Sequence, residues 1–269
     1  MSKEFQLGLI GAGVMGSALV RAAVSAGVVE GHQIVAYDPD TPRLQALCED
    51  TGAVPAASNA ELVAAADAVL LAVKPQAVGD VLGPLGFRSE QLLISIAAGV
   101  PIARLKALTG AEQPIARVMP NILCIVRAAA SAVVFSPEVS QSQRAFCRSL
   151  LGAAGMVVEV EETLMDAVTG LSGSGPAFVA LVIEALADGG VRAGLPRDQA
   201  LRLAAQTVAG TGKYVLETNE LPAALKDRVC SPAGTTIEGI AELEQAGVRS
   251  AFIEAVTRAA RRSAELGKG

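Results

Sequence analysis

The chain has 269 residues, of which 51% are apolar and 18% are charged, and its net charge is −5. This composition is typical of globular domains with sizeable cores and excludes a mainly disordered chain. Only 3% of the residues are aromatic and the charge is negative, so we expect no nucleic-acid partner. A single histidine, His32, is too few for most zinc sites, and we expect no metal centre.

The cysteines and the lengths of the apolar segments indicate in which cellular compartment the protein acts. Four cysteines, Cys48, Cys124, Cys147 and Cys230, include no CxxC pair, which favours buried free thiols in a reducing compartment. No uncharged apolar stretch reaches the roughly 20 residues of a membrane helix, and Glu4 and Gln6 interrupt the pattern of a signal peptide. We therefore expect a soluble, cytoplasmic protein without a membrane partner.

The first 162 residues alternate apolar, β-branched segments with helical ones, which indicates a parallel sheet covered on both faces. A further helix at Glu138–Leu151 lies between two possible edge strands, the last expected strand and Met156–Val160. The expected strands are Phe5–Ile10, Gln33–Asp38, Ala68–Val73, Leu92–Ile96, Pro114–Met119 and Ser131–Phe135, and the expected early helices are Met15–Ser25, Pro42–Glu49 and Asn59–Ala65.

From residue 163 onward the strand pattern ends and every segment is helical. GLPR is typical of one helix ending and another beginning, with Gly194 as the cap and Pro196 in the first turn. We expect an α/β protein with two domains, residues 1–162 binding a dinucleotide and residues 163–269 forming helices. The expected helices are Thr163–Leu171, Ala177–Ala193, Arg197–Glu217, Leu221–Val229, Thr236–Ala246 and Arg249–Leu266.

A phosphate-binding turn lies between the first strand and the first helix. Its residues are Gly11, Ala12, Gly13, Val14, Met15 and Gly16, which match GxGxxG in the required strand–turn–helix context. In such a Rossmann-type turn the glycines permit a tight turn, an approach to a pyrophosphate and close helix–strand packing. We expect a bound dinucleotide.

An acidic residue follows this turn at the spacing of a ribose contact. Asp38 ends the second expected strand, 22 residues after Gly16. A carboxylate there accepts hydrogen bonds from the ribose 2′-OH and repels a 2′-phosphate, which favours NADH over NADPH. Arg43 lies about one helical turn further on, where it could reach a 2′-phosphate. NADPH therefore remains an alternative cofactor.

Several motifs in order along nearly the whole chain resemble the pyrroline-5-carboxylate reductase family. The most specific are GLSGSGPA and SPAGTT, because many dehydrogenases share the glycine turn. The matching segments are Leu7–Met15, Ala72–Gln76, Ser95–Val100, Arg117–Asn121, Asp166–Ala177, Ala187–Arg197 and Leu225–Glu244.

The resemblance implies a set of cofactor contacts. It places Asn59 at the adenosine end and the Val73 backbone with the Lys74 side chain beside the nicotinamide ribose, in the loop that also contains Pro75. Ala97 and Ala98 end the next strand, where small residues either let a flat ring lie against the backbone or simply pack closely.

The resemblance also implies substrate contacts. Ser172, Gly173, Ser174 and Gly175 lie between two helical segments, where they either form a loop that binds a small anion or simply kink the helix, and Glu162 matches a family substrate contact. The backbone amides of Thr235 and Thr236 would hold the substrate carboxylate at a helix start, and the Thr236 hydroxyl would bind the ring nitrogen. Thr236 and Lys74 are thus the candidate catalytic residues.

The implied reaction is the reduction of 1-pyrroline-5-carboxylate to L-proline by NAD(P)H, the last step of proline biosynthesis. The family forms homodimers through the helical domain, and the dimers often assemble into rings of five. The sequence departs from the family at Val14, Ile122–Leu123 and Ala233, where a polar residue, Thr-Pro and glycine are usual.

Two alternatives belong to other classes. A β-hydroxyacid dehydrogenase would carry a helical GxxGxxxK segment. If Lys213 were the lysine of this motif, glycines would be expected at positions 206 and 209, which are occupied by Gln206 and Ala209. A non-catalytic dinucleotide sensor would be favoured by loss of the SGSGPA and SPAGTT segments, and both are present.

Overall fold

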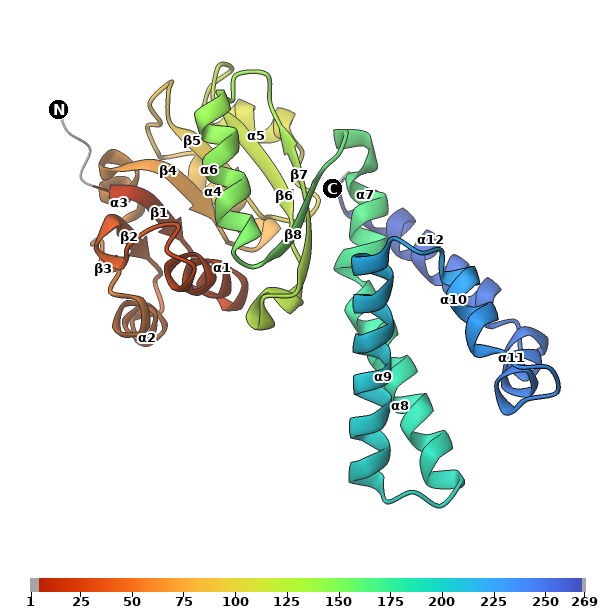
Figure 1. The fold of residues 1–269 in the computed structure, drawn as a ribbon. Coiled ribbons are helices and arrows are strands. Elements are labelled where there is room, and N and C mark those ends of the chain that lie inside the picture. The colour runs from red at the N-terminus through yellow and green to blue at the C-terminus, as the bar shows by residue number, and fades with distance from the viewer. Residues whose placement is uncertain (1–4, 268–269) are drawn as a thin grey trace. The chain divides into compact units, whose positions relative to one another are not determined.

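The computed structural model describes residues 5–267. The first part of the chain forms an eight-stranded sheet (Figure 1). Its order is β3-β2-β1-β4-β5-β6-β7-β8, and neighbouring strands are parallel except for the antiparallel pair β6 and β7. The strands are β1 (Phe5–Ile10), β2 (Ile34–Tyr37), β3 (Val54–Pro55), β4 (Ala66–Leu71), β5 (Leu92–Ser95), β6 (Ile115–Met119), β7 (Ala129–Phe135) and β8 (Gly155–Glu159).

Helices cover both faces of the sheet because its strands are apolar on both sides. One face packs against α1, α2 and α6 through residues such as Leu19, Leu47 and Leu150. The other packs against α3, α4 and α5 through residues such as Leu62, Leu82 and Leu105. The helices are α1 (Val14–Ser25), α2 (Thr41–Thr51), α3 (Asn59–Ala65), α4 (Val78–Leu82), α5 (Ile102–Thr109) and α6 (Gln141–Gly152). This arrangement confirms the predicted Rossmann-type fold.

The strand order places the expected ligand residues at one edge. The chain progresses from β1 towards β3 on one side and from β4 towards β8 on the other, so the order reverses between β1 and β4. Ligands of open α/β sheets bind at such a reversal, beyond the carboxyl ends of the strands. The turn after β1 and the loops after β2, β4 and β5 all meet there.

Two details of the sheet differ from the prediction. β7 is not an edge strand, because β8 pairs with it in parallel and β6 pairs on its other side. The two-residue strand β3 was not predicted; it pairs with β2 through Val35 and Ala36, a non-local contact that two residues cannot reveal in the sequence.

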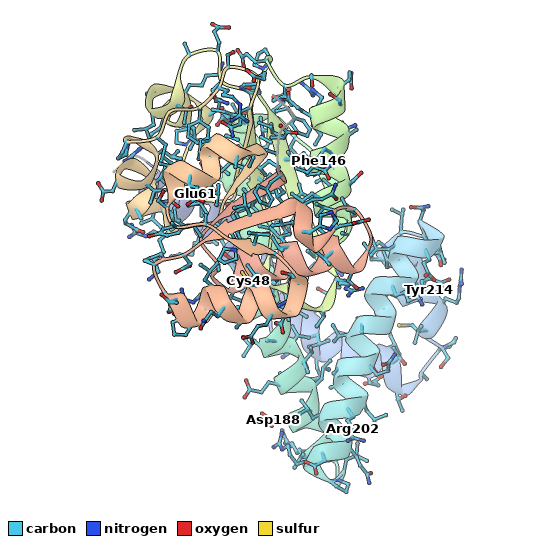
Figure 2. The ribbon with its side chains drawn as sticks, turned by 90° about the vertical axis from the view of Figure 1, so that its left-hand side faces the viewer. Cys48, Glu61, Phe146, Asp188, Arg202 and Tyr214 are labelled. Carbon is cyan, nitrogen blue, oxygen red and sulfur yellow. The ribbon has the colours of Figure 1, made fainter. Side chains whose placement is uncertain are left out.

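The remaining helices lie close to their predicted ranges. α8 (Gly175–Arg192) and α9 (Arg197–Thr218) pack together around Ala187, Ala200 and Ala204. Many of their apolar side chains stay exposed, among them Leu181 (65%) and Leu216 (66%), and Figure 2 shows the side chains that project from these helices, as at Asp188 and Arg202. The others are α10 (Pro222–Val229), α11 (Thr235–Gln245) and α12 (Val248–Leu266).

The chain forms two compact units whose limits differ from the predicted boundary after residue 162. The first unit runs to Ser174 and also includes the chain from Arg258 onward, and the second is Gly175–Thr257. Within the first unit, the Ser263 hydroxyl donates a 2.6 Å hydrogen bond to Asp166 Oδ1. Residues 163–174 and the end of α12 therefore belong with the sheet by their contacts.

Helical turns follow one another from Glu162 to Arg192, through α7 (Met165–Val168) and a π-helical turn, Thr169–Gly173, with a bend at Ser174. This 31-residue helix is long and apolar enough to cross a membrane by length and composition, and 11% of its most apolar window is buried. Because the sequence indicated a loop or a kink at SGSGPA, it did not predict a helix of this length.

Candidate active site

The turn between β1 and α1 has the backbone that close approach of the pyrophosphate requires. Gly11 has φ +96°, and a Cβ there would lie 2.8 Å from the Ala72 carbonyl oxygen. A Cβ on Gly16 would lie 2.5 Å from the Gly11 carbonyl oxygen, so only glycine lets α1 pack this close to β1 and β4. The turn is thus built as a cradle at a helix N-terminus, where a phosphate is favoured.

Asp38 is tied to this turn. Its Oδ2 accepts a 2.8 Å hydrogen bond from the Ala12 backbone N–H, and its Oδ1 accepts one of 2.8 Å from Asp40 N–H. The Arg43 guanidinium lies 3.8 Å from Asp38 Oδ2 and 3.1 Å from Asp40 Oδ2. Asp38, which follows β2 and is only 8% exposed, therefore shapes the turn, a role that the sequence did not reveal.

Asn59 supplies an unsatisfied acceptor at the same edge. It is the first residue of α3, which follows β3, and Ser58 caps that helix. Within residues 5–267, Asn59 Oδ1 is buried and has no hydrogen-bond partner. A buried acceptor without a donor is costly, so the position fits a ligand donor at the adenosine end of a dinucleotide.

The residues after β4 and β5 occupy different environments. Val73 is half-buried beside Gly11, Lys74 is exposed, and Pro75 starts a short 3₁₀ helix. The Ala97 side chain is buried in the core, whereas Ala98 is exposed in a turn with Gly99 at φ +74°. Ala98 is therefore the alanine whose methyl group faces the open edge.

Two cavities in the first unit bring expected cofactor and substrate residues together. One of about 240 Å³ is lined by Met15, Ile96, Ala98, Met119, Pro120, Asn121, Ile122 and Gly173. The other, of about 350 Å³, is lined by Pro75, Gln76, Ala98, Gly99, Thr169, Ser174, Ala259, Arg262, Ser263 and Leu266. Residues from the phosphate-binding turn, the β5 edge and SGSGPA thus share one region, in which Ala98 lines both cavities.

The SGSGPA segment is not a loop; of the two alternatives that the sequence left open, a loop and a kink in the helix, it matches the second. Thr169–Gly173 is π-helical, and Ser174 N–H donates to the Thr169 carbonyl. Pro176 has no N–H to offer to the carbonyl of Ser172, four residues earlier, and Asn121 Nδ2 donates to that carbonyl instead at 3.0 Å. π-helical turns of this kind are frequent at functional sites.

Glu162 makes two contacts through one oxygen. Its Oε1 accepts 2.8 Å hydrogen bonds from the Ile102 backbone N–H and from Arg117 Nη1. The resemblance assigns Glu162 to the substrate, whereas the structure shows it holding the start of α5 and a strand of the sheet. Neither partner could be found from the sequence, because they lie 60 and 45 residues away.

The second expected substrate segment lies in the second unit. Thr235 and Thr236 are the first two residues of α11, so their N–H groups precede the helix's own hydrogen bonds. Gly234 caps the helix, and Ala233 adopts φ +54° where the family has glycine. Ala233 thus adopts a left-handed conformation that favours glycine, and Thr236 is half-buried.

Other chemistry-bearing groups fit supporting roles. All four cysteines are free; burial raises the pKa of Cys147 to about 12 and raises that of Cys124. His32 is exposed beside Glu30 at 3.3 Å. Among residues 5–267, no group of three His, Cys, Asp or Glu side chains could hold a metal ion.

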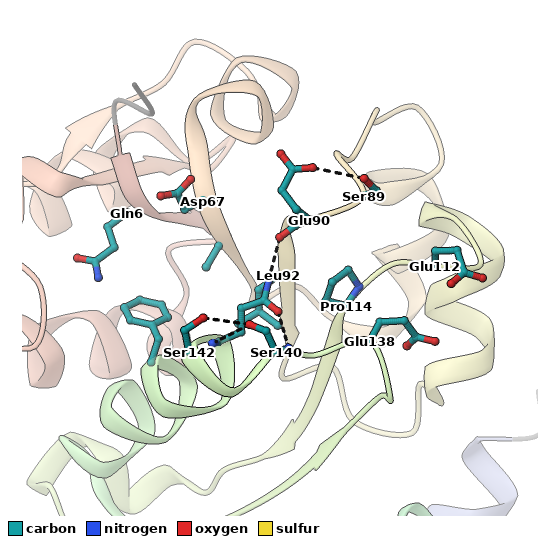
Figure 3. A pocket seen from close by; sticks show the side chains of 13 residues that line it. Gln6, Asp67, Ser89, Glu90, Leu92, Glu112, Pro114, Glu138, Ser140 and Ser142 are labelled. Carbon is teal, nitrogen blue, oxygen red and sulfur yellow. Dashed lines mark hydrogen bonds between the residues drawn. The ribbon is translucent and has the colours of Figure 1, made fainter. Parts of the chain in front are cut away.

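A larger cavity, of about 710 Å³, lies where several strands begin, away from the expected site residues (Figure 3). It opens among Gln6 of β1, Leu92 of β5 and Phe146 of α6, and its charged lining residues are acidic. None of the expected cofactor or substrate residues lines it. Size therefore does not identify the active site of this chain.

Comparisons with known proteins agree with this geometry. Residues 162–266 match the family described as pyrroline-5-carboxylate reductase dimerisation, and residues 6–99 match NADP oxidoreductase coenzyme F420-dependent.

Relatives match over almost the full length. Pyrroline-5-carboxylate reductases of Methanosarcina acetivorans and Escherichia coli are 48% and 39% identical, each over 98% of this chain and over 98% and 99% of their own. Solved reductases from Coxiella burnetii and Plasmodium falciparum, the latter with NADP bound, superpose with TM-scores of 0.92 and 0.87 at 32% identity, over 98% of this chain and 98% and 99% of theirs. The chain belongs to the pyrroline-5-carboxylate reductase family.

Proposed function

We propose that the protein reduces 1-pyrroline-5-carboxylate to L-proline with NAD(P)H, the last step of proline biosynthesis. The observation that carries this proposal is the pair of cavities that share Ala98, because they join the phosphate-binding turn, through Met15, to Gly173 and Ser174 of the family's most specific motif. The alternatives, a β-hydroxyacid dehydrogenase or a dinucleotide sensor, account for neither that motif nor SPAGTT.

The residues divide the work of binding. Gly11–Gly16 receive the pyrophosphate, Asp38 and Asn59 bind the adenosine end, and the edge formed by Val73–Pro75 with Ala97–Ala98 carries the nicotinamide. Ser172–Gly175 line the substrate site. The N–H groups of Thr235 and Thr236 hold the carboxylate, since helix N-termini favour anions.

The chemistry needs little covalent help from the protein. Reduction of the C=N bond adds a hydride to carbon and a proton to nitrogen, and a bound nicotinamide supplies the hydride. The Thr236 hydroxyl orients the imine by hydrogen bonding to the ring nitrogen, and water supplies the proton. Lys74 adds positive charge beside the cofactor. Positioning therefore accounts for most of the rate enhancement.

Absorbance at the NAD(P)H band tests the reaction. Purified protein mixed with 1-pyrroline-5-carboxylate and either cofactor is expected to oxidise the cofactor and to form proline in equal amounts. No loss of absorbance with either cofactor would refute the proposed function. Proline formation without cofactor loss would refute the hydride source.

NADH is the proposed preferred cofactor, and Asp38→Asn tests this. The amide removes the charge that opposes a 2′-phosphate; it keeps one oxygen for the Ala12 N–H and gives up the acceptor for the Asp40 N–H. The ratio of kcat/KM for NADPH to that for NADH should rise about tenfold, or roughly 1.4 kcal/mol. Asp50→Asn, an equal charge change at the far end of α2 where Asp50 pairs with Arg21, should leave the ratio unchanged. An unchanged ratio in Asp38→Asn would contradict the assignment.

The protein is also proposed to act in the cytoplasm as a homodimer that assembles into rings of five. The exposed apolar side chains of α8 and α9 support a partner copy, because patches of this kind mark interaction surfaces. Four free thiols support a reducing compartment. Light scattering of the purified protein measures the assembly directly.

A further inference from the structure

Arg117 is a buried cation on an interior strand of the sheet. It lies on β6 beside Ser95 of β5 and Val134 of β7, and its side chain is 10% exposed. It shares a face of the sheet with Ile115 and Met119, which belong to an apolar cluster. A buried guanidinium is tolerated only when a partner compensates its charge.

Glu162 is that partner, and it also caps a helix. Its Oε1 lies 2.8 Å from Arg117 Nη1 and accepts from the N–H of Ile102, the first residue of α5. The residue that precedes α5 is Pro101, whose side chain cannot cap a helix. A carboxylate 60 residues away therefore supplies the missing acceptor at the positive end of α5.

Both contacts adjoin the candidate active site. α5 begins directly after the Ala97–Val100 turn, whose Ala98 lines both cavities. Arg117 lies two residues before Met119, and a Cβ on Gly173 would lie 2.7 Å from the Met119 methyl group. One carboxylate oxygen thus links the turn after β5, the end of β6 and the start of the helix that carries SGSGPA.

We propose that Glu162 is a positioning residue rather than a substrate ligand. The Arg117–Glu162 pair holds the Ala97–Val100 turn in the conformation that receives the nicotinamide, and so sets the affinity for the dinucleotide. This inference rests on the proposed function for the identity of the ring bound at the turn.

The test compares Arg117→Gln, Glu162→Gln and the double variant. Each single variant should weaken NADH and NADPH binding about tenfold, as expected when a contact remote from the chemistry shifts a binding loop. The KM for 1-pyrroline-5-carboxylate at saturating cofactor should change less than about twofold. The double variant should resemble the singles, because the second change removes no further contact. It also keeps the test valid if Glu162→Gln alone fails to fold, since it leaves no unpaired charge buried.

Glu138→Gln is the matched control. Glu138 Oε1 accepts a 2.6 Å hydrogen bond from Lys106 in the last turn of α5, and this contact lowers the Glu138 pKa to about 2. Its loss weakens the anchoring of the same helix at the opposite end, so dinucleotide affinity should stay unchanged. An equal loss of affinity in this control would assign the effect to general loosening of α5 and overturn the proposal.

Dinucleotide dissociation constants, measured by NADH or NADPH fluorescence without substrate, separate this inference from the proposed function. If the wild type binds the cofactor but does not reduce the imine, the proposed function is refuted. The dissociation constants of the variants still test whether the Arg117–Glu162 pair sets the affinity for the dinucleotide. Glu162→Gln with unchanged cofactor affinity and a raised KM for the imine would make Glu162 a substrate contact and overturn the proposal.

Discussion

Gly13→Ala is expected to fold like the wild type and to lose most of its affinity for NADH and NADPH. Gly13 has φ −67°, an ordinary value for alanine, and within residues 5–267 no atom lies within 4 Å of the Cβ position. The added methyl group would occupy the space through which the backbone approaches the pyrophosphate. We expect the dissociation constant to rise about 100-fold, or roughly 2.8 kcal/mol.

Two other glycines make this result specific. Gly79→Ala, in α4, also adds a methyl group to open space and should change neither affinity nor stability by much. Gly16→Ala places Cβ 2.5 Å from the Gly11 carbonyl oxygen, so it should lower the unfolding free energy by about 1–3 kcal/mol or more. Cofactor fluorescence and thermal melts distinguish the two effects. Unchanged affinity in Gly13→Ala would remove the turn from the binding site.

The local signals in the sequence predict most elements of this fold. Apolar runs locate the strands of the parallel sheet, and β1 and α3 have their predicted bounds. Gly194 and Pro196 separate α8 from α9, and the five helices from α8 to α12 begin and end within two residues of prediction. These signals work because caps, glycine and proline act through the backbone of their own neighbourhood.

The errors arise where distant residues decide the structure. Two glycines and two serines at SGSGPA predict a break, but Asn121, 51 residues before Ser172, donates to the carbonyl that Pro176 leaves free, and the helical turns continue. The edge position assigned to β7 was wrong because β8 pairs beyond it.

Residue types and motifs predict the candidate site better than they predict residue roles. Met15 of the glycine turn and Gly173 of SGSGPA line the same cavity, and Ser174 lines the neighbouring one. The contacts of Asp38 with Ala12 and of Glu162 with Arg117 join segments 26 and 45 residues apart. Spacing in the sequence does not predict such pairs. The contacts that Asp38 and Glu162 make within the protein are therefore visible only in the structure.

Thr236→Val is expected to cause the largest loss of turnover. Valine preserves the shape of threonine but removes the hydroxyl that is proposed to bind the ring nitrogen. Loss of one preorganised donor or acceptor at a reacting centre lowers kcat by about 10²–10³-fold, or roughly 2.7–4 kcal/mol. The KM for the imine should change little, because valine keeps the backbone N–H at the start of α11 that is proposed to hold the carboxylate.

Steady-state kinetics with Thr236→Ser and Thr211→Val complete the test. Serine restores the hydroxyl and should recover most of kcat. Thr211 lies on α9 in the same unit and donates its hydroxyl to the Thr207 carbonyl, so its valine variant controls for the loss of a helical threonine hydroxyl. A raised KM with unchanged kcat in Thr236→Val would mean that the hydroxyl binds substrate and transition state equally, which is binding without catalysis. Unchanged kinetics would mean that the start of α11 contributes to the reaction only through its backbone N–H groups.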